Sequence, residues 1–337
     1  MPSVRPGSIS LVIPLCNGAE LIGQTLDSVA AQSEPPAEVI VVDDGSTDSG
    51  LEVVRDHPLA PRVLVQDRAG VAAARNRGAA NARHEWITFL DQDDLWHPKR
   101  LASVAEVEAQ FDVLLTSEIP FGHLEDEVQL REGLRPAAFV EAFVPRDAAL
   151  SALVELFPEV RSGSARHLSH LDLLTTTHAL STSFFVRREL ALVAGLFPTH
   201  AIAVDDHLFL TNVSRLGVLL KIDAPGVFYR VHPGSAFHTS RRLIPMLTSI
   251  AAARHGGFLT AAEVARSQDY SAQATVLDAL ADLRESERPT DRATARALSG
   301  LLVNPADRKV FTRRLIRDRL PEWARDIVVG VRRPFRR

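Results

Sequence analysis

The chain has 337 residues, of which 46% are hydrophobic and 24% charged, and its formal net charge at pH 7 is −4. This composition is that of an ordinary globular protein with room for one large domain or two smaller ones. A single cysteine, Cys16, excludes an intrachain disulfide and a structural zinc cluster of thiolates. The opening "MPSVRPGSIS" lacks the apolar core of a signal peptide, and no apolar run of ~18 residues could span a bilayer, so we expect a cytoplasmic protein.

Over the first 120 residues, apolar runs typical of strands alternate with apolar spacing typical of helices. Apolar runs predict strands at 9–15, 38–44, 62–67, 85–90 and 112–119, the first two of them buried, and helical spacing predicts helices at 19–32, 49–56, 70–83 and 98–111. Strands that alternate with helices predict a mostly parallel, Rossmann-like α/β sheet flanked by helices and joined by right-handed crossovers.

Polar residues gather where three of these strands end. "PLCN" follows the first strand, "DDGS" the second and "DQDD" the fourth. Ligands of such sheets bind beyond the carboxyl ends of the strands, so all three groups should open onto one crevice.

Two common nucleotide-binding loops are absent from this crevice. A dinucleotide-binding Gly-x-Gly-x-x-Gly turn should follow the first strand, where the sequence reads "PLCNGAEL". No Gly-x-x-x-x-Gly-Lys-Ser/Thr loop occurs either, which argues against a P-loop enzyme.

Three carboxylates, Asp91, Asp93 and Asp94, follow the fourth strand within four positions. Mg²⁺ and Mn²⁺ prefer oxygen ligands and often use one or two carboxylates together with substrate phosphates. The pattern therefore favours a divalent cation held against a diphosphate. The alternative is a solvated acidic turn in which Asp94 caps the next helix.

The successive motifs "ISLVIPLCN", "EVIVVDDGSTD", "GVAAARNRGAANARHEWITFLDQDDLW" and "YRVHPGS" resemble those of family 2 nucleotide-sugar glycosyltransferases, which have the GT-A fold. The resemblance is dense over 9–100, sparser over 180–237 and absent beyond about 245. It implies a nucleotide-sugar site. The residues expected there are Pro14, Cys16, Asn17, Asp43, Asp44, Arg75, Asp91, Gln92 and Arg230.

Within that expected site, Asp44 matches the acid that hydrogen-bonds the nucleotide base, although it could instead cap the "GSTD" turn. Cys16 stands where the family usually has an aromatic residue, so the stacking face for the base is lost. Arg75 matches an arginine that reaches the nucleotide or its phosphates, unless it is a plain surface charge. Arg230 matches a group that reaches the diphosphate.

The resemblance also implies a metal site and a catalytic base. Mn²⁺ or Mg²⁺ would be held by Asp91, Asp93, Asp94 and His232, with Asp93 the first choice as ligand. "GLFPTHAIAVDDHLFLTNVSRLG" resembles the segment in which an acidic pair opens a helix and its second acid is the base. Asp206 is then the candidate base and Asp205 its support, the alternative being helix capping alone.

These observations favour a metal-dependent inverting glycosyltransferase. We expect it to use a nucleoside-diphosphate sugar, most simply a UDP-sugar, and a glycan or lipid-linked acceptor in surface glycan or polysaccharide synthesis. A non-catalytic nucleotide-sugar-binding scaffold remains an alternative. A sugar-1-phosphate nucleotidyltransferase is less favoured, because its Gly-rich basic loop is missing after the first strand.

The predicted organisation is a GT-A domain over 1–245, with a nucleotide-sugar half (1–120) and an acceptor half (121–245), followed by a helical extension over 246–337. Residues 308–337 carry 11 Arg and Lys against three acids, whereas the rest of the chain is acidic. Such a tail suggests peripheral contact with the anionic inner face of a membrane rather than with nucleic acid, unless it is simply packed or disordered.

Overall fold

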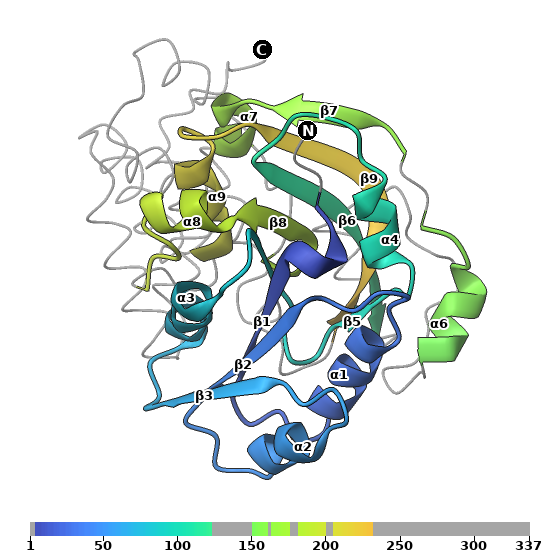
Figure 1. Ribbon diagram of the computed structural model, residues 1–337, viewed down its shortest axis with the longest axis vertical. Helices are drawn as coiled ribbons and strands as arrows, with labels where there is room; N and C mark the ends of the chain where they lie inside the picture. Colours follow the sequence, from blue (N-terminus) through green and yellow to red (C-terminus); the bar gives the residue numbers. More distant parts are fainter. Residues whose placement is uncertain (1–3, 123–149, 161–162, 176–180, 200–204, 232–337) are drawn as a thin grey trace, which may run out of the picture. The chain divides into compact units, whose positions relative to one another are not determined.

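The protein is described by a computed structural model (Figure 1) that covers residues 4–122, 150–160, 163–175, 181–199 and 205–231. The predicted extension over 246–337, its boundary after residue 245, and His232 lie outside these residues. In the part of the chain described, no helix is long and apolar enough to cross a membrane.

One sheet of nine strands runs through the described residues, in the order β3-β2-β1-β4-β8-β6-β9-β5, with β7 pairing to β9. Its strands are β1 (Ile9–Leu15), β2 (Glu38–Asp44), β3 (Arg62–Gln66), β4 (Trp86–Phe89), β5 (Leu95–Trp96), β6 (Val113–Gly122), β7 (Ala165–Leu168), β8 (Phe184–Arg187) and β9 (Leu219–Val231).

Helices lie on both faces of this sheet (Figure 1). They are α1 (Ile22–Ala30), α2 (Gly50–Asp56), α3 (Val71–Asn81), α4 (Arg100–Ala105), α6 (Leu150–Leu156), α7 (His170–Thr175), α8 (Arg188–Val193) and α9 (Asp205–Val213), with short 3₁₀ turns η1 (Pro6–Ser8) and η2 (Ser181–Ser183).

The parallel half of the sheet confirms the predicted alternation. β3, β2, β1 and β4 are neighbours and all run parallel. The fifth predicted strand, β6, does not continue that run, because β8 lies between β4 and β6 and is antiparallel to both. Hydrophobic periodicity predicts a buried strand, but it does not determine which strands pair with it in the sheet.

Separate apolar cores fill the space between the sheet and the helices, and β1 contributes to two of them. Along β1, the side chains of Ile9, Leu11, Ile13 and Leu15 belong to the core under α1, α2 and α4, whereas Val12 belongs to the core under α3, α8 and α9. All seven residues of β1 are buried. Coverage on both faces explains why this strand is a continuous apolar run rather than an alternating one.

Candidate functional site

The candidate site lies at the carboxyl edge of the parallel strands. Leu15 of β1 pairs with Asp43 of β2, Asp44 pairs with Gln66 of β3, and Val12 of β1 pairs with Phe89 of β4. The polar segments that follow these strands therefore leave the sheet together, as the sequence predicted.

Gln92 joins the segment after β4 to the segment after β1. Its side-chain Oε1 accepts from the backbone N–H of Cys16 at 2.7 Å, and its Nε2 donates to the Cys16 carbonyl at 3.1 Å. A Cβ on Gly18 would lie 2.7 Å from this side chain, so a larger residue there would displace the end of Gln92 from these bonds. Pro14 is buried inside β1. Gln92 thus holds the segments after β1 and β4 together at the candidate site.

Asn17 joins the segments after β1 and β2. Its φ of +50° is left-handed, which asparagine tolerates better than most residues. Its backbone N–H donates to Ser46 Oγ at 3.1 Å, and its Oδ1 accepts from the Thr47 N–H at 2.8 Å. Asp43 Oδ1 accepts from the Ser46 N–H at 3.2 Å and completes this junction.

Asp44 is buried at the end of β2, with both carboxylate oxygens engaged. Oδ1 accepts from Gln66 Nε2 at 2.8 Å and from the Ala69 N–H at 2.7 Å, and Oδ2 accepts from the Gly70 N–H at 2.8 Å. Asp44 therefore anchors the turn before α3. It does not cap the "GSTD" turn, where Asp48 instead accepts from the Gly50 N–H.

The thiol of Cys16 lies against this junction, donating to the Asp44 carbonyl at 3.6 Å. Burial raises the pKa of Cys16, and the charge of Arg68 lowers it less than burial raises it. The thiol is therefore neutral at physiological pH and presents a small polarisable surface at the position where the family usually has an aromatic ring.

Arg75 lies at the centre of the site. It is 5% exposed, and its guanidinium bridges two carboxylates: Nη2 contacts Asp91 Oδ1 at 2.6 Å, and Nη1 contacts Asp205 Oδ2 at 2.8 Å. Arg75 is therefore not a plain surface charge. It joins α3, the segment after β4 and the start of α9 in one ion-paired cluster.

Arg230 is also buried, where it holds the turn that carries the other two acids. Its backbone N–H donates to Asp94 Oδ1 at 2.9 Å, its Nε donates to the Asp93 carbonyl at 2.7 Å, and its Nη2 donates to Gln24 Oε1 at 2.9 Å. The guanidinium stacks on Phe121, 4.6 Å from the ring centroid. These contacts hold the turn at 93–94 in place.

The acidic trio is crowded. Burial, followed by the charges of Asp93 and Asp91, raises the pKa of Asp94 well above its usual range. Asp94 is not a helix cap, since α4 begins only at Arg100. Its Oδ2 is buried and accepts no hydrogen bond of ordinary geometry from the described residues, although the nearby Thr182 hydroxyl lowers the pKa.

Within the described ranges, no three His, Cys, Asp or Glu side chains come together as a metal-binding group. An ion that shares a diphosphate needs only one or two protein carboxylates, however. The buried Asp94 oxygen without a regular partner, beside two further carboxylates, is compatible with a cation at this turn.

Asp206 lies at the first turn of α9, partly exposed. Its Oδ1 accepts from the His207 N–H at 2.7 Å, and its Oδ2 accepts from the Ser181 N–H at 3.2 Å. Burial, followed by the charge of Asp205, raises the pKa of Asp206 to about 7, while Arg75 lowers it. A carboxyl with that pKa can accept a proton near neutral pH.

Ser181 was not predicted, yet it lies between the two halves of the site. Its backbone N–H reaches Asp206, and its hydroxyl lies 3.4 Å from Asp91 Oδ2. The sequence offered one indirect signal, since Ser181 lies within the predicted acceptor half, 121–245.

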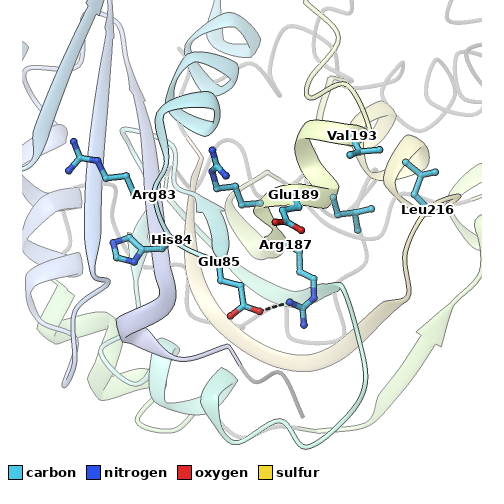
Figure 2. Close-up of a pocket in the computed structure, with 9 residues that line it drawn as sticks. Arg83, His84, Glu85, Arg187, Glu189, Val193 and Leu216 are labelled. Carbon is cyan, nitrogen blue, oxygen red and sulfur yellow. Dashed lines mark hydrogen bonds and ion pairs between the residues drawn. The ribbon is translucent and has the colours of Figure 1, made fainter.

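A pocket of about 580 Å³ lies elsewhere. It is lined by Arg83, His84, Glu85, Arg187, Arg188, Glu189, Leu190, Val193 and Leu216. Figure 2 shows Glu85 paired with Arg187 on its wall. Arg187 is the register partner of Trp86, the first residue of β4. The pocket therefore lies at the amino end of β4, whereas the candidate site follows its carboxyl end.

Comparison with known proteins identifies relatives of the first part of the chain. Residues 10–118 match the family described as Glycosyl transferase family 2. An uncharacterized glycosyltransferase of Nostoc sp. PCC 7120, alr2836, is 36% identical over 110 residues, which are 32% of this chain and 34% of that protein. The putative teichuronic acid biosynthesis glycosyltransferase TuaG of Bacillus subtilis is 28% identical over 138 residues, 40% of this chain and 52% of that protein. The chain thus spans about a third to a half of these relatives.

Solved structures extend the likeness over most of the chain. Residues 1–349 of S. aureus TarS, in complex with UDP-GlcNAc, align with a TM-score of 0.53 at 19% identity, covering 93% of this chain and 91% of that one. The mannosyltransferase PcManGT of Pyrobaculum calidifontis, in complex with GDP-Man and Mn²⁺, aligns with a TM-score of 0.53 at 20% identity, covering 92% and 85%. At these identities the likeness is one of fold.

Proposed function

We propose that this chain, whose residues 10–118 match glycosyl transferase family 2, moves a sugar from a nucleoside-diphosphate sugar to an acceptor hydroxyl, with inversion at the anomeric carbon. The likeness of its fold to TarS and PcManGT supports a GT-A transferase. The observation that carries the proposal is the meeting of Asp91 and Asp206 at Ser181, beyond the carboxyl edge of the parallel strands.

Asp206 is the proposed general base. It takes the proton of the acceptor hydroxyl, which attacks the anomeric carbon on the face opposite the diphosphate. Its pKa of about 7 matches the requirement that the base be ionised near neutral pH while still holding the proton well. Asp205 supports this position indirectly through its ion pair with Arg75.

The segments that follow β1, β2 and β4 form the proposed donor site. The residues proposed to contact the donor there are Cys16, Asn17, Asp43, Asp44 and Gln92. We favour a UDP-sugar as the donor. TarS is solved with UDP-GlcNAc and with UDP, and PcManGT with GDP-Man, which supports a nucleotide-sugar donor in general. The engaged oxygens of Asp44 mean that base recognition by this residue would require the 69–70 turn to move.

The turn at 91–94 is the proposed metal site, with Asp93 as first ligand and Asp91, Asp94 and His232 as further candidates. A bound Mn²⁺ or Mg²⁺ would neutralise the donor diphosphate and act as a Lewis acid toward its departing oxygen. The chain's own contribution is to hold these carboxylates together, through Arg75 on Asp91 and Arg230 on the turn 93–94.

The acceptor is proposed to be a glycan or a lipid-linked sugar, and the place of action the inner face of a cell membrane. The support is the basic segment 308–337, which would be attracted to anionic headgroups.

Nucleoside diphosphate release tests the function. The full chain is incubated with UDP-GlcNAc, UDP-glucose, UDP-galactose and GDP-mannose, each with Mn²⁺, Mg²⁺ or EDTA and a panel of glycan acceptors, and both released nucleotide and glycosylated product are measured. We expect one donor to be turned over, EDTA to abolish turnover, and Asp206→Asn to lose at least about 10²-fold in kcat while still binding UDP.

Arg187→Met is the control. Arg187 lies at the amino end of β4, away from the candidate site, so this variant should keep wild-type turnover. Donor binding without transfer for every donor would instead support the non-catalytic alternative, and wild-type turnover by Asp206→Asn would remove this residue from the role of base.

A further inference from the structure

Behind the candidate base lies a buried support that no motif indicated. The segment 181–184 contacts the candidate base through Ser181. The carbonyl oxygens of its next three residues, 182, 183 and 184, each accept a hydrogen bond from a buried side chain. Arg100 Nη2 donates to the Thr182 carbonyl at 3.1 Å, and Thr116 Oγ1 donates to the Ser183 carbonyl at 2.8 Å. Thr88 Oγ1 donates to the Phe184 carbonyl at 2.8 Å.

Arg100 is the centre of this support. The residue is fully buried, and its guanidinium carbon lies 5.2 Å from the ring centroid of Trp96 and 4.9 Å from that of Phe185. Its Nη1 donates to Thr116 Oγ1 at 3.0 Å, so the two side chains act together. A Cβ on Gly226 would lie 3.0 Å from the Arg100 side chain, which leaves the guanidinium little room to move.

A buried cation is costly to the fold unless it is paired and hydrogen-bonded. Arg100 is stabilised by the charge of Glu118 and by its bonds to Thr116 and to the Thr182 carbonyl. The last of these bonds brings Arg100 within one residue of the site. The carbonyl that Arg100 holds belongs to Thr182, and Ser181, directly before it, donates its N–H to Asp206 and its hydroxyl to Asp91. Fixing the 181–183 turn therefore fixes the distance between the proposed base and the donor-side carboxylate.

We propose that Arg100 and Thr116 are positioning residues that hold the Ser181 turn so that Asp206 faces the donor with its carboxylate correctly placed. The inference rests on the proposed function and adds two residues, on α4 and β6, that touch neither donor nor acceptor. A misplacement of about 1 Å in such a group can cost on the order of 10²-fold in rate.

Arg100→Met and Thr116→Val test the proposal. Both keep the size of the side chain roughly constant and remove the hydrogen bonds to the 182 and 183 carbonyls. With the donor that the wild type turns over, we expect kcat to fall about 10- to 100-fold while KM for the donor stays within about threefold. Arg100→Lys, which can still donate one bond, should recover part of kcat.

One comparison separates a positioning role from general damage to the fold. Arg187→Met removes another arginine that stacks on a tryptophan, 4.7 Å from the Trp86 ring, without touching the 181–183 turn, and should keep wild-type kcat.

A titration of the free protein tests the proposal even if no donor is turned over. The ¹³C signal of the Asp206 carboxyl, assigned with Asp206→Asn, should titrate at higher pH in Arg100→Met and Thr116→Val than in the wild type, by about half a pH unit or more, because the N–H that stabilises the ionised form is displaced. Folded variants with unchanged titration and, where a donor is found, unchanged kcat would overturn the positioning role. A wild type that turns over no donor overturns the proposed function alone.

Discussion

Asp44 and Asp206 are acids of the same site with different surroundings. Asp44 is enclosed by three donors that occupy both of its oxygens. Among the described residues, Asp206 accepts from two backbone N–H groups, and its burial, followed by the charge of Asp205, raises its pKa to about 7. The surroundings, not the residue type, distinguish Asp44, which anchors a turn, from Asp206, the proposed proton acceptor.

The pH dependence of transfer follows from Asp206. Only the ionised carboxyl accepts a proton, so kcat/KM should rise as the pH increases through about 7 and fall about tenfold per pH unit below it. The measurement is an initial-rate profile from pH 5 to 9 with saturating metal. A profile that stays flat down to pH 5 would contradict the assignment.

Arg75 is the residue whose loss should cost the fold most. Its removal leaves Asp91 and Asp205 without their common cation. We expect Arg75→Met to lower the free energy of unfolding by about 3–5 kcal/mol, measured by denaturant titration. Arg77→Met, on the exposed side of the same helix, is the control and should change it by less than about 0.5 kcal/mol. Equal effects of the two substitutions would refute the structural role of the Arg75 bridge.

At the level of elements, the site depends on how closely α3 packs on β1. Gly78 faces the sheet, and a Cβ there would lie 2.2 Å from Val12 Cγ1, far inside van der Waals contact. The missing side chain lets the helix carry Arg75 down to Asp91. The glycine is thus required by packing rather than by a turn.

Gly78→Ala should therefore destabilise the protein by about 1–3 kcal/mol, because the helix must move away from the sheet. Gly23→Ala in α1 is the matched control: its Cβ would lie 3.6 Å from Val53, an ordinary contact, and the change should be neutral or stabilising. Adding Val12→Ala should recover part of the loss in a double-mutant cycle, and strict additivity would argue against the clash.

At the level of the whole molecule, the site is assembled from both halves of the described chain. The first half contributes β1, β2 and β4 with the donor-side acids, and the later residues contribute the Ser181 turn, the Asp205–Asp206 pair and Arg230. The strands β8 and β9 bring the later residues to the sheet, since β8 pairs with β4 and β9 pairs with β6.

The proposed membrane contact is tested on the whole chain. Co-sedimentation with vesicles containing about 30% anionic lipid should retain the full chain and lose it on removal of residues 308–337, which carry 11 basic side chains. Neutral vesicles are the control, and raising the salt concentration should release the protein. Equal sedimentation with and without the segment would contradict the proposal.

The sequence by itself determined the local elements and the chemical character of the site. Continuous apolar runs predicted β1 and β2 at their observed bounds, and the Asp205–Asp206 pair was expected to open a helix, as α9 does. Each of these features depends on residues only a few positions apart in the chain, and their spacing can be read directly from the sequence.

Only the tertiary structure decided how the predicted residues are used. Gln92 bonds Cys16, 76 positions away, Arg75 pairs with Asp205, 130 positions away, and β8 separates β4 from β6. These contacts follow from the order of strands in the sheet, which hydrophobic periodicity does not specify. For that reason Ser181 reaches Asp206, and Arg100 reaches the Thr182 carbonyl, only when the chain is folded.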